Sequence, residues 1–258
     1  MRILRLKATI CDIKPAIWRR LEVPADLTLH GLHNCLQATF GWTDTHLHEF
    51  EIAGVSLAPP DPDSFEEHLD SRKQPLWELE GKVDGFTYTY DFGDGWEHKI
   101  EIEAWANAEE GVKYPRCTAG ARHCPPEDCG GSGGYADLLE ALADPAHEEH
   151  ETMKEWVGSY FSPEQFSLSR ANGVIRNVRT PAHKPGPGPW TKALEGPKKS
   201  AFQPEDRSMI LDDLMLQFKT AGAAMTPELE KAVNELVDLR MGLLTGKTKK
   251  APKKQKGK

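Results

Sequence analysis

The chain lacks any long hydrophobic run. No stretch approaches the eighteen or more consecutive apolar residues of a membrane span, and the N-terminal MRILRLKATICDIKP has no signal-peptide hydrophobic block. Cysteine is also scarce, because 258 residues contain only five, an odd number that does not suit a closed disulfide framework. These absences exclude a membrane protein and a disulfide-stapled secreted domain, and they predict a cytoplasmic protein.

The common catalytic motifs are missing too. There is no GxSxG elbow and no kinase signature, and HEEH (147–150) spaces its histidines by three where the HExxH zinc-protease pattern needs four. The glycine-rich GGSGGY (130–135) lacks the lysine and serine of a P-loop. No motif therefore names a reaction.

Charge is distributed unevenly along the chain. The net charge is −8, but residues 1–180 carry 17 Lys/Arg against 31 Asp/Glu, whereas residues 181–258 carry 15 against 9. An acidic region of net charge −14 repels phosphate backbones, so the main domain is a poor nucleic-acid binder by bulk charge. The final GKTKKAPKKQKGK (246–258) holds seven lysines and predicts a disordered tail that makes weak nonspecific contact with nucleic acid.

Hydrophobic periodicity predicts strands and one long helix in the first half of the chain. Thr28 is a good N-cap for a helix that ends at Gly41. Strands are predicted by alternation, and the FGDG turn predicts a hairpin. The expected strands cover 3–10, 17–23, 46–52, 86–91 and 96–103; residues 55–75 are expected to form a long surface loop, and helices are expected over 135–143, 148–157 and 163–178.

The composition changes at Thr180. Five prolines and three glycines over 180–200 predict a linker, and two amphipathic patterns follow it. We therefore expect a main domain at 1–179, a Pro/Gly-rich linker at 180–204, a helical hairpin extension at 205–245 and the lysine-rich tail at 246–258. The fold class is α+β: an antiparallel sheet of hairpins with a packed N-terminal helix, a following helical segment and the C-terminal two-helix extension.

Alternation in HLHEFEI (46–52) predicts a cleft. It places His46 and His48 on one face of the strand, where neutral imidazoles could bind a metal. The alternative is a pair of core-edge histidines that hydrogen-bond carboxylates such as Asp91. Asp91 and Asp94 bracket the hairpin turn, where paired carboxylates hold a cation or simply bond their own backbone. With Trp96, these residues are predicted to line the cleft.

A second group of residues predicts a zinc site. Cys117, Cys124 and Cys129 are spaced C-x6-C-x4-C in a Pro/Gly-rich stretch, and tetrahedral zinc needs a fourth ligand, which His98 on the preceding strand would supply. The spacing is not the paired C-x2-C of zinc ribbons, so three cysteines that pack a loop, or one reactive thiol, remain alternatives.

Several short motifs together resemble the pRiA-plasmid ORF-three-like family, also labelled a mobile-element passenger (resolvase-type) family. They are IWRRLEV, GW (41–42), HLHEF, DFGDGWEH and CPPEDCGG, and the resemblance extends from Ile3 to about Val178. It implies a small α+β domain whose biochemical function is largely undefined. The resolvase label would imply a serine nucleophile with an arginine cluster, which the sequence does not assign. The residues that match the family are His46, His48, Asp91, Gly93, Asp94, Trp96, His98, Cys117, Cys124, Pro125, Pro126, Asp128, Cys129, Gly130, Gly131 and Tyr135.

The sequence thus predicts a cytoplasmic zinc-binding domain that acts as an accessory or interaction module for an unidentified protein partner, rather than an enzyme. One alternative is an accessory protein of mobile-element DNA transactions. Another is a metal-dependent hydrolase, which would require three protein ligands and a water on the metal instead of a closed shell of four ligands.

Overall fold

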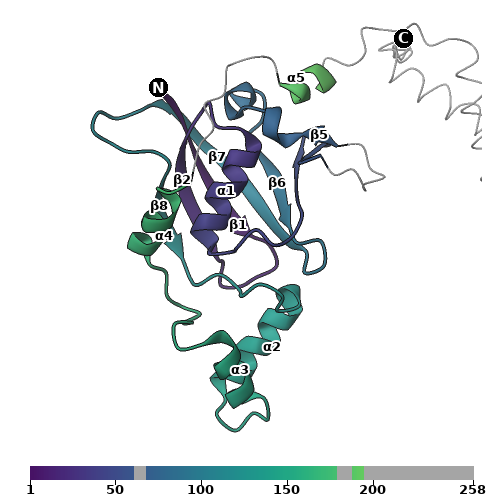
Figure 1. Cartoon of the computed structure of the whole chain (residues 1–258), viewed down its shortest axis with the longest axis vertical. Helices are drawn as coiled ribbons and strands as arrows, with labels where there is room; N and C mark the ends of the chain where they lie inside the picture. The colour runs from purple at the N-terminus through teal and green to yellow at the C-terminus, as the bar shows by residue number, and fades with distance from the viewer. Residues whose placement is uncertain (61–67, 179–187, 195–258) are drawn as a thin grey trace, which may run out of the picture. The chain divides into compact units, whose positions relative to one another are not determined.

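The computed structural model describes residues 1–60, 68–178 and 188–194, and its centre is an eight-stranded sheet (Figure 1). The strand order is β5-β4-β3-β6-β7-β1-β2-β8, and neighbours pair antiparallel except β4 and β5. Helices accompany the sheet, so the α+β class is confirmed.

Strand β1 (Arg2–Ile10) lies in the middle of the sheet. It pairs with β2 (Trp18–Pro24) and with the long β7 (Trp96–Asn107), so that Leu6 lies opposite Leu21 on one side and Ile102 on the other. The predicted alternation holds along β1, because its apolar residues are buried and its basic residues are not. One face of the sheet is therefore apolar.

Helix α1 (Leu29–Phe40) lies across this apolar face (Figure 1). The Thr28 hydroxyl accepts a hydrogen bond from the backbone N–H of Gly31, and Gly41 ends the helix with φ 96°. Both predicted ends are confirmed. Nine of the twelve helical residues are buried, His33 among them, so polar side chains are carried into the core together with the leucines.

The FGDG hairpin and strand β3 (His48–Ile52) form the other half of the sheet. Strands β6 (Gly85–Tyr90) and β7 flank the turn as predicted, and β3 pairs with β6. In this register His48 lies opposite Tyr90, and Tyr88 lies opposite His98. All four side chains are buried, and their rings lie against His33 or Phe40 of α1.

Two regions predicted as loops contain strands. Residues 55–75 include β4 (Val55–Ala58), β5 (Leu69–Asp70) and a 3-10 turn at Ser71–Lys73, followed by another at Leu76–Leu79. The prediction of one long loop was wrong because β4 has a short apolar stretch that gains stability only by pairing with β3. Strand β8 (Arg116–Ala121) was also missed, so Cys117 lies on an edge strand and not in a loop.

The later helices lie around this sheet. Helix α2 (Gly131–Ala143) packs on α3 (His150–Val157), and α4 (Leu168–Ile175) lies beside β8 and α1 (Figure 1). Helix α5 (Pro189–Leu194) falls within the predicted linker, and its Trp190 is fully buried, with the indole donating to the Ile52 carbonyl. The predicted extension at 205–245 and the tail lie outside the described residues.

Within the described ranges, no helix has both the length and the apolar character needed to cross a bilayer.

Candidate metal centre

Three segments that are distant in sequence converge beside the end of β6. They are the turn after α1 (42–47), the FGDG turn (91–95) and the loop that follows β8 (122–130). The backbone N–H of Asp91 donates to the Leu47 carbonyl at 2.9 Å, which joins the first segment to the second. The Trp42 indole donates to the Pro125 carbonyl at 3.1 Å, which joins the first segment to the third. The motifs HLHEF, DFGDG and CPPED are thus brought to one place.

Glu127 and Asp94 fix the third segment more firmly. Glu127 accepts hydrogen bonds from the Tyr90 hydroxyl at 2.5 Å and from the hydroxyl of Thr43. Asp94 accepts one from the backbone N–H of Gly130 at 3.1 Å. Gly131 then has φ 68°, and a Cβ there would meet the Asp94 carbonyl oxygen at 2.4 Å, so only glycine allows this close approach.

The convergence places one imidazole between two carboxylates. Nε2 of His46 lies 3.0 Å from Oδ1 of Asp128 and 3.6 Å from Oδ2 of Asp91. One ligand atom from each residue lies within 4.8 Å of those of the other two. Asp91 is buried, His46 is partly exposed and the Asp128 side chain is 72% exposed, so the group is open to solvent on one side.

Asp91 has its two oxygens in different roles. Oδ1 accepts from the backbone N–H groups of Gly93 at 3.0 Å and Asp94 at 3.3 Å, which fixes the carboxylate in the turn. Oδ2 is the atom nearest His46. The two alternatives for this residue, turn former and cation ligand, are therefore compatible, since each uses a different oxygen. Asp94 itself bonds Gly130 and is not part of the His46 group.

The arrangement around His46 calls for a proton or a cation at Nε2. Carboxylate oxygens only accept hydrogen bonds, and an imidazole nitrogen with a lone pair would be repelled by two of them. Nε2 is buried, and among the described residues it has no hydrogen bond of good geometry, even though Asp128 is near. A proton on Nε2 would satisfy the group only in part, whereas a divalent cation between the three atoms would satisfy all of them.

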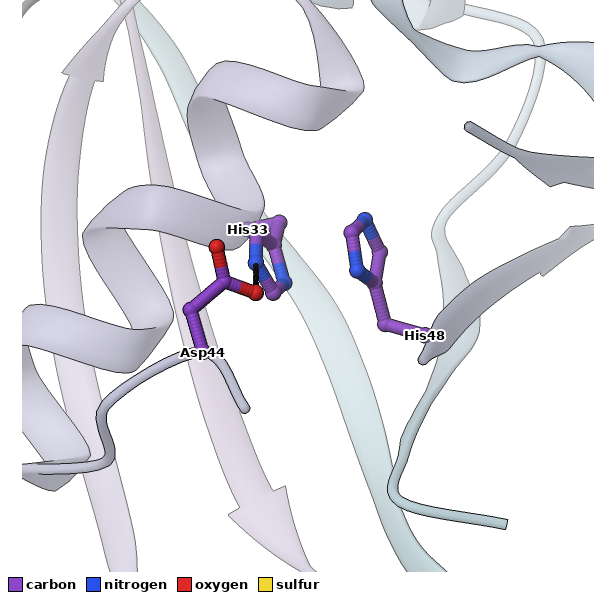
Figure 2. A group of neighbouring side chains, drawn as sticks. All are labelled: His33, Asp44 and His48. Atoms are coloured by element: carbon purple, nitrogen blue, oxygen red, sulfur yellow. Dashed lines mark hydrogen bonds and ion pairs between the residues drawn. The ribbon is translucent and has the colours of Figure 1, made fainter. Parts of the chain in front are cut away.

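A second group of histidine and aspartate lies deeper, under α1. His33 from α1, Asp44 from the turn after α1 and His48 from β3 lie together (Figure 2). The rings of His33 and His48 are parallel, with centroids 3.4 Å apart and planes 8° from each other. His30, one turn earlier on α1, stacks at 5.7 Å from His33.

The nitrogens of His33 are both engaged. Nε2 lies 2.8 Å from Oδ1 of Asp44, and Nδ1 lies 2.8 Å from the hydroxyl of Tyr88. An ionised carboxylate cannot donate, so the proton of the neutral imidazole is on Nε2, and Tyr88 donates to Nδ1. Gln37 completes a closed circuit of hydrogen bonds, because its side-chain NH2 donates to the Tyr88 hydroxyl and its side-chain carbonyl accepts from the Asp44 backbone N–H. We call Gln37, Tyr88, His33 and Asp44 the histidine network.

The charge state of these rings follows from their burial. Removal from water, with the neighbouring His30, lowers the pKa of His33 to about 3. Burial, and then His33 and His30, lower the pKa of His48 to about 3 as well. Both imidazoles are neutral at pH 7, which permits the close stack. Because both nitrogens of His33 are already bonded, the histidine network has the features of a structural element and not of a ligand set. Nε2 of the stacked His48 is buried and has no hydrogen-bond partner among the described residues.

His46 and His48 therefore belong to two different groups of residues. The sequence placed them on one face of one strand, but β3 begins at His48, and His46 belongs to the preceding turn. Tyr90 lies between the two groups, with its ring 5.8 Å from His46 and 6.3 Å from His33. The pattern at His30 and His33, three residues apart on a helix, was the signal that could have placed an imidazole under α1.

The predicted zinc ligands His98, Cys117, Cys124 and Cys129 do not form such a group in the described part of the chain. The groups of three or more ligand atoms found there contain none of the four. Nδ1 of His98 lies 2.9 Å from the Trp96 carbonyl, and burial lowers its pKa to about 4. The Cys117 thiol donates to the Ala119 carbonyl, and burial raises the pKa of Cys129 to about 12. The cysteine site stays a prediction.

Trp96 was predicted to line a cleft. Its side chain is 2% exposed, and its ring lies 6.0 Å from that of Trp42. Trp96 is therefore a core residue and does not line a cleft at the surface.

Comparison with known proteins gives a family and two relatives. Residues 2–170 match the family described as plasmid pRiA4b ORF-3-like protein. A protein of Sinorhizobium fredii (strain NBRC 101917 / NGR234), called uncharacterized protein y4hQ, is 43% identical over 159 residues, which are 61% of this chain and 81% of that protein. A crystal structure of a protein of unknown function, MM3350 from Methanosarcina mazei Go1, is 40% identical with a TM-score of 0.60, over 65% of this chain and 96% of that one.

Proposed function

We propose that this chain, which belongs to the plasmid pRiA4b ORF-3-like family, is a divalent-metal-binding module whose cation is held by His46, Asp91 and Asp128. The observation that carries the proposal is the position of Nε2 of His46, at 3.0 Å and 3.6 Å from two carboxylate oxygens. Its role, as predicted from the sequence, is that of an accessory or interaction domain.

The donor set favours zinc or a metal of similar chemistry. One imidazole nitrogen and two carboxylate oxygens are borderline to hard ligands, and such mixed sets suit Zn²⁺, Mn²⁺ or Fe²⁺ better than Cu⁺. The thiols that would select a soft metal lie outside the group. Zinc therefore remains the proposed metal, with ligands that differ from the cysteine set.

A metal-dependent hydrolase is the second candidate, and the openness of the site favours it. Three protein ligands leave a position for water on a tetrahedral ion, and the exposed side chain of Asp128 leaves that position accessible. A metal that only stabilised the fold would more often have a closed shell of four protein ligands. The DNA-transaction alternative stays a prediction.

The test is elemental mass spectrometry of tag-free protein, followed by zinc titration in competition with a chromophoric chelator. We expect about one equivalent of a divalent metal, with affinity lowered at least about tenfold in Asp91→Asn, since the amide keeps the shape but loses the charge. Asp44→Asn is the matched control, because it makes the same change in the histidine network and should leave the affinity within about twofold.

Two results would overturn the assignment. If Cys117→Ser/Cys124→Ser/Cys129→Ser abolishes binding while Asp91→Asn does not, the metal is held by the cysteines. If freshly purified, folded protein neither contains nor takes up zinc, manganese or iron, the metal-binding function itself is wrong.

A further inference from the structure

We propose that an open cleft beside strand β8 binds a small ligand that carries a di- or triphosphate group. The cleft has a volume of 1110 Å³ and is lined by strand β2, the edge strand β8, the connection from β7 to β8, and helix α4. It is separate from the His46 group and does not depend on the metal proposal. Its charged lining consists of Arg5, Arg20, Lys113, Arg116, Arg176, Glu22 and Glu103.

The cleft has the opposite sign to the rest of the domain. Five cations against two carboxylates give the lining a charge of +3, whereas residues 1–180 together carry −14. A concentration of positive charge inside an acidic domain attracts an anion that is small enough to enter the cleft. A long polyanion such as duplex DNA would instead have to lie against the acidic surroundings. The cleft therefore suits a compact phosphate.

Glu22 holds two of the arginines in place. Its side chain is 1% exposed, and its Oε1 accepts from Nε of Arg5 at 2.9 Å, while its Oε2 accepts from Nε of Arg116 at 2.6 Å. Burial raises the pKa of Glu22, and the bonds from the two guanidinium groups lower it by more, so that the pKa lies below its ordinary value. The carboxylate stays ionised and fixes both guanidinium groups.

The arginines keep donors for a ligand. Arg5 and Arg20 use their Nε and Nη2 atoms on Glu22 and Glu103, and within the described residues their Nη1 atoms have no hydrogen bond. Guanidinium groups that are already oriented lose little entropy on binding a phosphate and can bond it in a bidentate manner. A site of this kind differs from a set of mobile surface lysines.

Two further cations have no carboxylate partner. For Lys113, on the β7–β8 connection, and Arg176, at the end of α4, no ion pair is found with any residue whose placement the structure gives. They come from two elements outside the strands, the β7–β8 connection and the end of α4, while Arg5 and Arg20 come from the sheet. A diphosphate bound between these elements would be contacted from several sides, which distinguishes this cleft from an isolated surface ion pair.

The test is isothermal titration of the full chain with inorganic pyrophosphate and with ATP, in buffer without divalent cations. We expect saturable binding that weakens with salt, and a loss of at least about tenfold in Lys113→Glu/Arg176→Glu, equivalent to one lost charge-assisted contact. Lys99→Glu/Lys154→Glu makes the same charge change outside the cleft and should lose less than about twofold. Equal binding of pyrophosphate and ATP would indicate that the cleft recognises the phosphate groups alone. Tighter binding of ATP would indicate that the ligand is a nucleotide.

Five outcomes would overturn the proposal. The first three are the absence of saturable binding to either probe, equal loss in the two double variants, and loss only when the seven tail lysines are replaced by glutamine in the full chain. Binding that disappears in Asp91→Asn but persists in Lys113→Glu/Arg176→Glu would place the phosphate on the metal and also exclude the cleft. If duplex DNA competes through Lys113 and Arg176, the ligand is a nucleic acid and the small-ligand assignment is wrong.

Discussion

Two groups of histidine and aspartate lie on either side of Tyr90, and they differ in how fully the nitrogens of His33 and of His46 are satisfied. In the histidine network, both nitrogens of His33 and the hydroxyl of Tyr88 have partners, and the His33 ring is fully buried. In the His46 group, Nε2 faces two carboxylates without a hydrogen bond of good geometry, and Asp128 is exposed. The same residue types thus make a structural network in one place and a candidate ligand site in the other.

The difference arises from the elements that carry the residues. The histidine network has three of its four residues on α1 and β6, whose backbones are fixed by helical and ladder hydrogen bonds, and only Asp44 on the turn after α1, so its geometry contributes to stability. The His46 group is built on three turns and loops, where a side chain can be kept accessible to a ligand. We therefore expect changes in the first group to alter the free energy of unfolding, and changes in the second to alter metal affinity.

The largest expected effect is the loss of stability in mild acid. The pKa of His33 and that of His48 lie at about 3 in the folded protein against an ordinary value of 6.5. Between these values the unfolded chain binds more protons, so stability is complete above pH 6.5 and falls as the pH falls. Each histidine contributes up to about 1.4 kcal/mol per pH unit, or about 4 kcal/mol for both between pH 6.5 and 5. Urea denaturation across this range measures it.

The control for this experiment is His33→Leu/His48→Leu. The double variant should be less stable at pH 7 but should depend less steeply on pH. A wild-type stability that is flat between pH 6.5 and 5 would contradict the assignment of neutral, buried rings.

The second effect is the loss of the network through His33→Leu alone. The variant leaves the Tyr88 hydroxyl without its acceptor and Asp44 without its donor, so we expect a loss of about 3 kcal/mol in the free energy of unfolding at pH 7. Zinc affinity should change by less than about twofold. If the affinity falls as strongly as the stability does, the two groups form one site and the comparison fails.

The third effect, of Tyr88→Phe, should be smaller. The ring and its packing against Phe50 remain, and only the hydroxyl is removed, so we expect a loss of about 1 kcal/mol. The pKa of His33 is not expected to rise to the neutral range, because burial is its main cause. Chemical denaturation and the chemical shifts of the His33 ring check the two statements separately.

The smallest effect on stability is expected for Asp128→Asn. The side chain is 72% exposed, so the free energy of unfolding should change by no more than about 0.5 kcal/mol. Zinc affinity should nevertheless fall at least about tenfold, since one charged ligand is lost. Unchanged affinity in this variant, with a lowered affinity in Asp91→Asn, would remove Asp128 from the ligand set.

Local patterns predicted much of the sheet and the main helix. The alternation of β1 and β2, the capped helix from Leu29 to Phe40 and the hairpin around FGDG are all confirmed, because each depends on side chains and turns that are near in sequence. Strands β4 and β8 were missed because they are short edge elements whose partners decide their conformation. The candidate site was predicted in part, since His46 and Asp91 come together but His48 and Asp94 have other roles.

Local sequence patterns were sufficient to predict the class of fold, the ends of α1, the FGDG hairpin and the concentration of histidine, aspartate and cysteine in three motifs. Which of these residues meet depends on long-range contacts. Strand alternation tells which face a side chain is on, but it carries no information on which loop crosses that face. The pairing of His46 with Asp128 instead of with a cysteine follows from hydrogen bonds such as that from Trp42 to Pro125, which join segments 83 residues apart.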